Sequence, residues 1–396
     1  MIKQEQVVIT TALRTPIGSF GGAFKNLKAP ELAIPVMVAI VKKTGIDPQI
    51  IDDVIWGCAY QRVRNETNIA RVAAIRAGIP DTVPGVTVQR VCTSAMWAIV
   101  SGAQAIKAGD AQVILAGGVE SMSTVPYTLD ALRWGARLNH VEANDALWDG
   151  VDRLGIGPSM GITAENLAEK YHISRGEQDE LACSSHRKAI KAIRDGRFKD
   201  EIIPITVPQK KSQPLIIDTD EGPRADINLE KLAKLAPIFK KDGTVTAGNA
   251  CSMNDGAAGV LIMSQSKAEK LSLKPLARII SYAVAGVDPN IMGIGPAFAS
   301  RIALEKANLK LNQIDIIECN EAFAAQYLAV EKELGINREI TNVNGSGIAL
   351  GHPVGATGCR IIVTLLYEMQ KRGNKFGLAT LCGGGGVSMA LIVERY

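Results

Sequence analysis

Residues 32–59 read LAIPVMVAIVKKTGIDPQIIDDVIWGCA, and residues 296–324 read PAFASRIALEKANLKLNQIDIIECNEAFA. Both stretches have the pattern of a helix, a turn, an Ile-Asp pair and then an apolar strand. Asp52 and Asp315 mark the matching point in the two copies. The chain therefore contains an internal duplication, and this repeat decides the predicted fold.

The two copies stay in step further along the chain. About forty residues later, the first copy reaches Cys92 and the second reaches His352. Each residue is followed by a helix of small residues and then by a strand that ends in glycines. The helices cover 93–109 and 355–373, and the strands cover 110–118 and 375–386. Strands that alternate with helices predict two α/β halves with largely parallel or mixed sheets. We expect the matching turns of the two halves to face a shared cleft, where ligands bind in such folds.

The middle of the chain, residues 122–252, interrupts the repeat. It holds polar turns, short apolar runs and a helical stretch at 161–193. We interpret it as an inserted lobe that covers the cleft. Residues 253–274 have the pattern of a strand and a helix that return to the first half. The predicted domains are therefore 1–121 with 253–274, the lobe 122–252, and 275–396.

Composition limits the class of protein. The 396 residues suffice for a large core, and 47% hydrophobic with 21% charged residues is typical of a globular chain. The net charge of +4 is too small, and the charges too interspersed, to indicate a nucleic-acid partner. No run of about 18 apolar residues occurs, so we expect no membrane span. The N-terminus lacks the apolar core of a signal peptide.

The seven cysteines are scattered and form no CxxC pair. Such usage is typical of a reducing compartment, with neither a disulfide framework nor a metal site. We therefore expect a cytoplasmic protein without a bound metal.

Cys92 ends the apolar run VTVQRVC and opens a helix. Because helix N-termini carry partial positive charge, we expect this position to favour the thiolate. Lowering a thiol pKa from about 8.5 to about 7 corresponds to about 2 kcal/mol. The alternative is a buried structural cysteine, since free cysteine packs as a small hydrophobe.

His352 and Cys382 lie in two further glycine-rich turns. His352 is one of four histidines, and it is the natural proton acceptor for a nearby thiol. Cys382 precedes four glycines, which fits a place where backbone N–H groups face a substrate. A structural loop histidine and a packing cysteine are the alternatives. Two thiols and one imidazole suggest an enzyme that carries an acyl group on sulfur.

Short motifs follow one another over essentially the whole chain. In order they are VCTS (91–94), GITAEN (161–166), TVTAGN (244–249), NDGAA (254–258), MGIGP (292–296), NEAFA (320–324), GHPVGATG (351–358) and CGGGG (382–386). Each motif alone is a weak signal, but the ordered set resembles that of the thiolase family, the acetyl-CoA acetyltransferase and 3-ketoacyl-CoA thiolase group. The resemblance implies a thiolase-like α/β fold of two duplicated halves, layered α-β-α-β-α, with 122–252 as the inserted, coenzyme A-binding loop domain.

The resemblance also implies catalytic roles. Cys92 matches the nucleophile that takes the acyl group as a thioester, and His352 matches the base that activates it. Cys382 matches the group that protonates the departing carbanion in cleavage or removes the α-proton in condensation. Asn320 matches the residue that holds a water, which with His352 forms the oxyanion hole for the enolate. The backbone N–H groups of Cys92 and Gly384 match the second oxyanion hole.

Other positions match contacts with the substrate. Those of the acyl pocket are Met160, Met292 and Phe323, and those of the loop domain that touch coenzyme A are Arg224, Phe239 and Ala247. Two further contact positions depart from the family pattern. Ser159 replaces a histidine before GITAEN, and Cys251 lies in GNACS where GNASG is usual.

The departures bear on the acyl group. Trp97, Trp134 and Trp148 add bulk in the nucleophile helix and the inserted lobe, although ordinary packing also accounts for them. We hypothesise a bulky, branched, aryl or dicarboxylic 3-oxoacyl-CoA substrate, as in fatty acid or aromatic acyl-CoA metabolism. The alternative is acetoacetyl-CoA, the substrate of an acetyl-CoA C-acetyltransferase.

The predicted reaction is thiolytic cleavage of a 3-oxoacyl-CoA, or the reverse Claisen condensation. Coenzyme A is then a co-substrate, with no permanently bound cofactor. The resemblance implies a homodimer or homotetramer, and the stretch 121–130 is a candidate for assembly. Three alternatives stay open: a decarboxylating ketoacyl synthase, a non-catalytic acyl-CoA or lipid carrier, and a subunit that needs a partner protein.

Overall fold

A large mixed sheet forms the centre of the computed structural model, which describes residues 5–61, 64, 66–210 and 212–396. Among these residues the sheet has ten strands, in the order β12-β13-β14-β11-β1-β10-β5-β3-β4, with β2 paired to β10. The strands are β1 Val7–Arg14, β2 Gly18–Ser19, β3 Asp53–Gly57, β4 Gly85–Val88, β5 Val113–Ser121, β10 Asn254–Ser264, β11 Ala277–Gly286, β12 Ile316–Cys319, β13 Phe376–Gly383 and β14 Val387–Arg395.

The duplication is visible in the strand pairing. In the first half, β3 runs parallel to β5, and β10 and β1 follow antiparallel. In the second half, β12 runs parallel to β13, and β14 and β11 follow antiparallel. The matching aspartates make the same contacts. Asp52 Oδ2 accepts the N–H groups of Gln112 and Val113, and Asp315 Oδ2 accepts those of Lys375 and Phe376.

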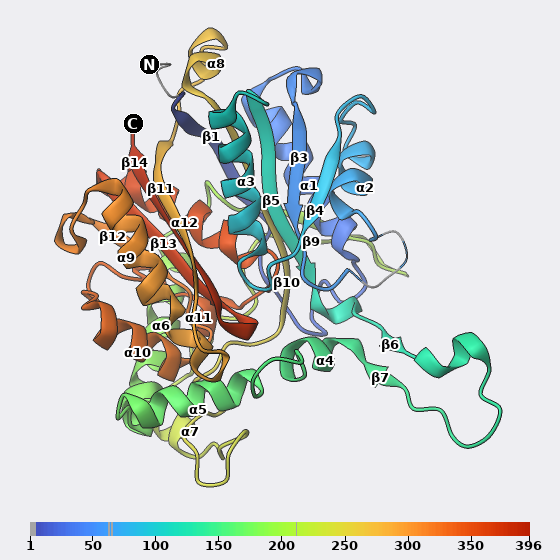
Figure 1. Ribbon diagram of the computed structural model, residues 1–396, viewed down its shortest axis with the longest axis vertical. Helices are drawn as coiled ribbons and strands as arrows, with labels where there is room; N and C mark the ends of the chain where they lie inside the picture. Colours follow the sequence, from blue (N-terminus) through green and yellow to red (C-terminus); the bar gives the residue numbers. More distant parts are fainter. Residues whose placement is uncertain (1–4, 62–63, 65, 211) are drawn as a thin grey trace.

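The two half-sheets meet through one short antiparallel pair, β1 with β11, at Val8–Arg278 and Ile9–Ala277. Helices α3 (Ser94–Ala108) and α12 (Thr357–Arg372) pack against each other and against both half-sheets. The outer helices are α1 (Ala29–Thr44), α2 (Ile69–Arg76), α9 (Gly295–Ala307) and α10 (Ala324–Leu334). The first two cover the first half and the last two cover the second, as Figure 1 shows. The predicted order of layers, α-β-α-β-α, is thus confirmed.

Small residues let the central helices approach closely. A side chain on Gly358 of α12 would place its Cβ 2.6 Å from the backbone nitrogen of Met96 in α3. No real Cβ contact is that short, so glycine is required there. This packing brings the N-terminal ends of α3 and α12 together.

The segment between β5 and β10 leaves the layers and runs along one end of them (Figure 1). An arm that carries β6 and β7 projects from the body, and the lobe behind it packs α5 and α6 on α10 and α11. Its elements are η2 Met122–Thr124, β6 Tyr127–Thr128, η3 Asp130–Trp134, β7 Asn144–Asp145, α4 Ala146–Asp152, α5 Met160–Lys170, α6 Arg175–Arg194, β8 Ile205–Val207, β9 Leu215–Ile217 and α7 Leu229–Ala233.

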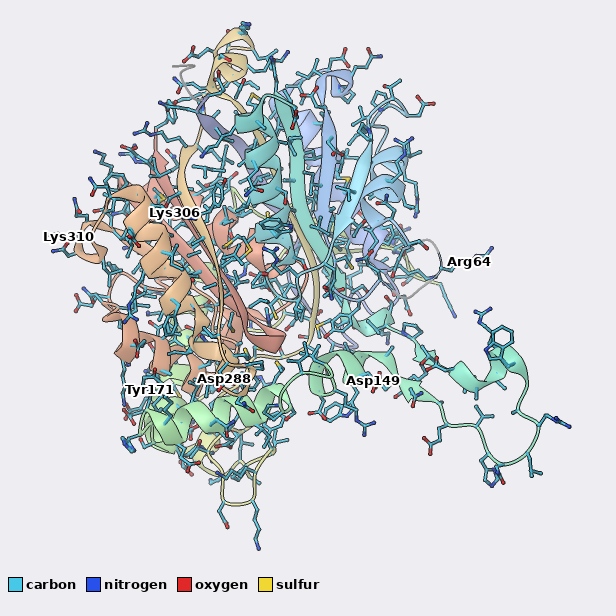
Figure 2. The ribbon with its side chains drawn as sticks, viewed as in Figure 1. Arg64, Asp149, Tyr171, Asp288, Lys306 and Lys310 are labelled. Atoms are coloured by element: carbon cyan, nitrogen blue, oxygen red, sulfur yellow. The ribbon has the colours of Figure 1, made fainter. Side chains whose placement is uncertain are left out.

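Short elements complete the chain. They are η1 Pro48–Ile50, α8 Gln265–Lys270, η4 Pro289–Ile294, η5 Leu311–Gln313, α11 Gly347–Leu350 and η6 Gly384–Gly386. Charged side chains lie on the outside, as Figure 2 shows for Lys306 in the last turn of α9 and for Lys310 after that helix. Within the described ranges, no helix has the length and apolar content that crossing a membrane requires.

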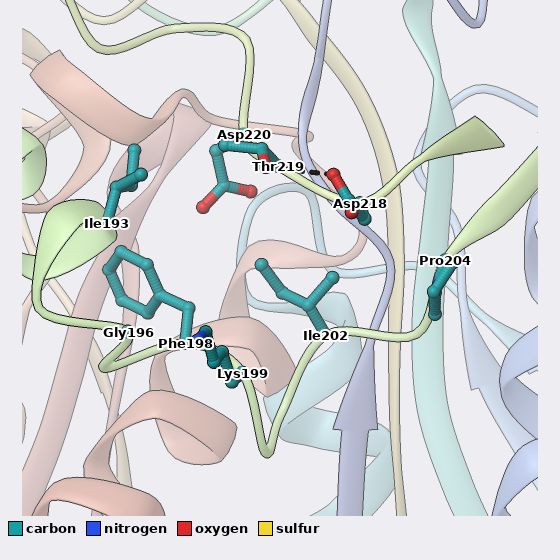
Figure 3. A pocket seen from close by; sticks show the side chains of 9 residues that line it. All are labelled: Ile193, Gly196, Phe198, Lys199, Ile202, Pro204, Asp218, Thr219 and Asp220. Carbon is teal, nitrogen blue, oxygen red and sulfur yellow. Dashed lines mark hydrogen bonds between the residues drawn. The ribbon is translucent and has the colours of Figure 1, made fainter. Parts of the chain in front are cut away.

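A buried ionic cluster ties β1 to the inserted segment. Arg14 donates from Nε to Glu201 at 2.7 Å and from Nη1 and Nη2 to Asp220 at 2.7 and 3.0 Å. All three side chains are almost completely buried, and the guanidinium also lies 5.0 Å from the centre of the Phe198 ring. Beside Phe198 and Asp220 the surface opens into a cavity of about 260 Å³ (Figure 3).

Replacement of Arg14 tests this connection. Arg14→Met should lower the free energy of unfolding by about 3–5 kcal/mol, because two buried carboxylates lose their charge partner. Urea denaturation followed by circular dichroism measures the change. Lys240→Gln is the control, because the Lys240–Glu169 pair is exposed, and its effect should be far smaller. Equal losses in the two variants would contradict the role given to Arg14.

Candidate active site

One cavity of about 240 Å³ brings together Cys92, His352 and Cys382. Cys92 lies in the turn between β4 and α3, and His352 lies in the matching turn between α11 and α12. Cys382 comes from the end of β13, and Gly384 follows it. The lining consists of Tyr60, Val91, Cys92, Met122, Trp148, Gly150, Val151, Leu154, Met160, Phe239, Ala250, Cys251, Ser252, Met253, Met292, Ala322, Phe323, His352, Val354, Cys382 and Gly384.

The turn before Cys92 is strained. Val91 has a φ of 49°, a left-handed conformation that a β-branched residue rarely adopts. The Ser94 hydroxyl holds this turn, since it accepts the N–H of Arg90 at 2.8 Å and donates to the Val91 carbonyl at 2.6 Å. The strain therefore serves to set the position of Cys92 at the cavity wall.

The protonation state of Cys92 differs from the expectation. Burial raises the pKa of the Cys92 thiol to about 11, although hydrogen bonds from the backbone N–H groups of Gly384 and Cys92 itself favour the thiolate. The negative charge of Glu120 raises the pKa further. The expected fall towards about 7 is thus wrong, because desolvation in an apolar cavity outweighs the field at the start of α3.

His352 is held as a neutral base. Burial, and next the charge of Arg360, lower the pKa of the imidazole to about 3. Its Nδ1 lies 2.7 Å from Thr357 Oγ1, whose hydroxyl donates to the Pro353 carbonyl at 2.9 Å. The hydroxyl has one proton, so it accepts from Nδ1–H, and this assigns a free lone pair to Nε2. Sequence reasoning missed Thr357, although it is the first residue of α12, the helix that follows His352.

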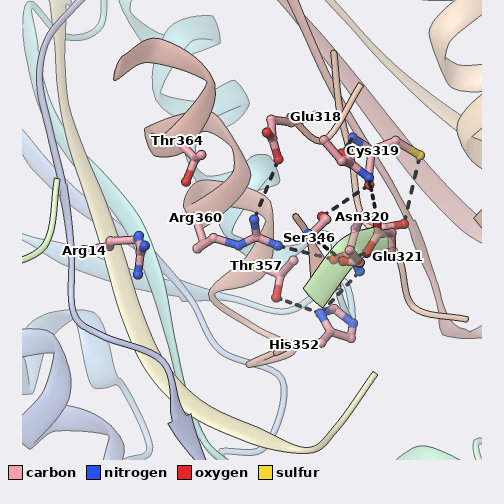
Figure 4. Close-up of polar contacts among 12 residues, drawn as sticks. Arg14, Glu318, Cys319, Asn320, Glu321, Ser346, His352, Thr357, Arg360 and Thr364 are labelled. Carbon is pink, nitrogen blue, oxygen red and sulfur yellow. Dashed lines mark hydrogen bonds and ion pairs between the residues drawn. The ribbon is translucent and has the colours of Figure 1, made fainter. Parts of the chain in front are cut away.

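Asn320 lies directly behind the imidazole and is completely buried. Its Nδ2 is 3.4 Å from His352 Nδ1, and its backbone N–H donates to the Thr380 carbonyl at 3.0 Å. Figure 4 shows Asn320 between His352 and Arg360. The Asn320 backbone is thus fixed to β13, and its carboxamide lies beside the imidazole.

Cys382 is also held as a thiol. Burial raises its pKa well above the usual value, and the nearby sulfurs of Cys92, Cys319 and Cys251 raise it further. A neutral thiol beside Cys92 can donate a proton to a carbanion. Cys251 lines the same cavity as Cys92 and Cys382.

Glu120, at the end of β5, is a site residue that sequence reasoning missed. It accepts the N–H groups of Ala59 at 3.0 Å and Tyr60 at 3.2 Å from the first half, and that of Gly355 at 2.8 Å from the second. It therefore joins the loop that holds Tyr60 to the turn that holds His352. Burial raises the pKa of its carboxyl to about 7. Only its neighbours in space reveal this role.

The predicted coenzyme contacts divide into two groups. Met160, Phe239, Cys251, Met292 and Phe323 line the cavity. The rings of Phe239 from the lobe and Phe323 from the second half meet edge to face, with centres 6.2 Å apart. The others, Ser159, Arg224 and Ala247, are not among the lining residues.

These three residues lie elsewhere on the lobe. Ser159 caps α5, where its hydroxyl accepts the N–H of Ile162. Arg224 and Ala247 are exposed, and the backbone N–H of Arg224 donates to His186 Nδ1 at 3.1 Å. These three residues therefore do not line the cavity that holds the thiols.

Two of the three tryptophans expected to add bulk lie outside the cavity. Trp97 packs under the guanidinium of Arg90, at 3.7 Å from its ring centre, and Trp134 is 89% exposed on the projecting arm. Only Trp148 lines the cavity. Tyr60, Met122 and Leu154 line it as well, and the sequence offers no local signal for them.

The raised pKa of Cys92 makes a prediction for the free enzyme. Because the thiolate is the nucleophile and His352 is neutral, inactivation by iodoacetamide should accelerate about tenfold per pH unit between pH 7 and 9. Peptide mapping should locate the adduct at Cys92, and Cys92→Ser serves as the control. A rate that levels off below pH 8 would instead indicate a preformed thiolate–imidazolium pair.

Comparison with known proteins identifies the family. The model of the thiolase N-terminal domain matches residues 7–266, and that of the thiolase C-terminal domain matches 273–395. An acetyl-CoA acetyltransferase of Pseudomonas aeruginosa is 54% identical over 99% of this chain and 100% of its own length.

Solved structures agree. The Bacillus anthracis acetyl-CoA acetyltransferase superposes with a TM-score of 0.96 at 53% identity, over 99% of each chain. Human mitochondrial 3-ketoacyl-CoA thiolase in complex with CoA superposes with a TM-score of 0.96 at 42% identity, over 99% of this chain and 98% of that one. The chain therefore belongs to the thiolase family and is an acyltransferase.

Proposed function

We propose that this protein is an acetyl-CoA C-acetyltransferase, which cleaves acetoacetyl-CoA with coenzyme A or condenses two molecules of acetyl-CoA. The observation that carries the proposal is the cavity shared by Cys92, His352 and Cys382, with Asn320 behind it. Three relatives, at 54%, 50% and 51% identity, bear the name acetyl-CoA acetyltransferase, which supports the two-carbon acyl group.

Cleavage begins at Cys92. Nε2 of His352 accepts the thiol proton while the sulfur attacks the 3-keto carbon, and an S–C bond forms. Because both groups start neutral, charge appears only as the reaction proceeds. The backbone N–H groups of Cys92 and Gly384 then stabilise the oxyanion, and one such donor is typically worth about 3–4 kcal/mol.

The carbon–carbon bond breaks next. Its electron pair moves into the thioester of the leaving part as an enolate, whose oxygen faces the protonated Nε2 of His352 and the Asn320 side. The Cys382 thiol donates its proton to the carbanion carbon, and acetyl-CoA leaves. The Cys382 thiolate then takes the proton of the coenzyme A thiol, whose sulfur attacks the acetyl-Cys92 thioester. The Cys92–acetyl bond breaks, Cys92 takes the proton back from His352, and a second acetyl-CoA is released. Condensation is the reverse.

The size of the cavity favours a short acyl group. The cavity has a volume of about 240 Å³, and its lining includes Trp148, Tyr60, Met292 and Phe323. The hypothesis of a bulky substrate relied on departures from the family pattern and on three tryptophans, of which two do not line this cavity. We therefore prefer acetoacetyl-CoA over branched, aryl or dicarboxylic 3-oxoacyl-CoA substrates.

The inserted lobe is our candidate for the coenzyme A-binding domain. It supplies Met160 and Phe239 to the cavity, while Ser159, Arg224 and Ala247 lie further out on the lobe and suit the outer part of the coenzyme. We propose the domain limits 1–121 with 253–274, 122–252, and 275–396. Coenzyme A acts as a co-substrate, with no permanently bound cofactor.

We also propose a homo-oligomer, either a dimer or a tetramer. The arm carries apolar side chains that face outward, with Trp134 89% and Leu138 85% exposed. Such a patch on a projecting segment suits contact with a second copy of the chain. A cytoplasmic location fits the seven free cysteines.

Intact mass spectrometry tests the thioester. Incubation with acetyl-CoA should add one acetyl group to the wild type, and peptide mapping should place it on Cys92. Cys92→Ser should lose the adduct, whereas Cys183→Ser, a buried thiol on α6 outside the cavity, should keep it. No adduct in the wild type would overturn the proposal and favour a carrier.

Substrate range and the role of Cys382 can be measured together. The kcat/KM for thiolysis should be highest for acetoacetyl-CoA among 3-oxoacyl-CoA substrates of increasing length and with an aryl group. Cys382→Ser should slow α-proton exchange of acetyl-CoA in D2O by about a hundredfold or more, because a general acid–base is lost. Unchanged exchange would favour a decarboxylating synthase, and a preference for the longer or aryl substrates would restore the bulky hypothesis.

A further inference from the structure

A buried ion pair lies behind the catalytic asparagine. Arg360 of α12 and Glu318 of β12 are 1% and 0% exposed. Arg360 Nη1 and Glu318 Oε2 are 3.8 Å apart, which is too long for a hydrogen bond. Neither Glu318 oxygen, nor Nε and Nη1 of Arg360, has a hydrogen-bond partner within the described part of the protein.

Within the same described residues, the Arg360 guanidinium does donate a hydrogen bond to a residue of the candidate site, Asn320. Nη2 donates to Asn320 Oδ1 at 3.5 Å (Figure 4). A guanidinium can only donate, so the Asn320 atom that faces it must be the carbonyl oxygen. The amide nitrogen then points to the other side, where His352 Nδ1 lies 3.4 Å away.

A comparison with Arg14 shows that Arg360 is not a simple structural tie. Arg14 satisfies its guanidinium with short bonds to Glu201 and Asp220 and with the Thr15 carbonyl. Arg360 is equally buried but makes a single long bond, although an apolar side chain at this position would avoid the cost of burying a charge. Its retained charge lies next to Asn320 and His352, where the reaction develops negative charge.

We propose that Arg360 is a positioning residue for the carbon–carbon step, which holds the Asn320 carboxamide with its N–H group turned towards the enolate oxygen. Glu318 supplies the counter-charge that lets Arg360 remain buried. The inference rests on the proposed function, because it assigns Arg360 to one step of that reaction. The positive charge of Arg360 also favours negative charge on an enolate oxygen nearby.

The first test measures α-proton exchange, which reports on the carbon–carbon step. Arg360→Met should slow α-proton exchange of acetyl-CoA by between about tenfold and a hundredfold, as expected for a misplaced catalytic group. The KM should stay near that of the wild type, so the loss falls on kcat. Thr364→Val is the matched control, because Thr364 lies one turn further along α12 and donates to Glu201 instead. It should keep the wild-type rate.

The second test asks whether Arg360 acts through Asn320. In an Asn320→Ala background, adding Arg360→Met should change the exchange rate by less than about twofold, because the group that Arg360 positions is already absent. A full multiplicative loss in the double variant would overturn the proposal. So would an exchange rate for Arg360→Met equal to that of Thr364→Val.

A third variant guards against unfolding. Removal of Arg360 alone leaves Glu318 buried without its partner, so Glu318→Gln/Arg360→Met removes both charges. This neutral pair should recover the thermal stability of the wild type but not its exchange rate. Recovery of both would show that the pair is only structural. Absence of exchange in the wild type would instead reject the proposed function itself.

Discussion

The close packing of α3 against α12 is the constraint on which the site depends. The two helices lie between the half-sheets, and glycine at position 358 allows their backbones to approach. Cys92 and His352 come just before their N-terminal ends. Duplication therefore does more than double the fold: it places the same turn twice at one cavity, and each copy supplies a different chemical group.

Burial of the side chains around that cavity sets their protonation states. Burial keeps the thiols of Cys92 and Cys382 protonated and the His352 imidazole neutral. The resting site thus holds little charge. In the proposed reaction, backbone N–H groups and the Asn320 carboxamide stabilise the charge, and they need no reorganisation when it appears. Thr357 completes this arrangement, because it selects the nitrogen of His352 that stays free.

Buried charges serve two different purposes in this chain. The Arg14 cluster is fully hydrogen-bonded and joins β1 to the inserted segment, so its energy is structural. The Arg360–Glu318 pair is poorly bonded and lies beside Asn320. Within one molecule, a buried charge can thus be structural or can lie beside the site, and the hydrogen bonds around the charge distinguish the two cases.

Much of this protein follows from its sequence alone. The repeat predicts two α/β halves, and Asp52 and Asp315 mark matching strands because each side chain caps the next strand in the same way. The patterns of 93–109 and 355–373 predict the helices that follow Cys92 and His352. The turn at the start of the helix 93–109 identifies Cys92, and two glycine-rich turns identify His352 and Cys382, because such turns combine a reactive side chain with free backbone N–H groups.

Only the tertiary structure decided the rest. The pKa of Cys92, the roles of Glu120 and Arg360, and the distance of Trp97 and Trp134 from the cavity all depend on neighbours far apart in the chain. The local sequence pattern predicts the conformation of a segment, because backbone preferences act over a few residues. Desolvation and charge–charge contact arise from what packs around a group, and that is settled only when the two halves and the lobe come together.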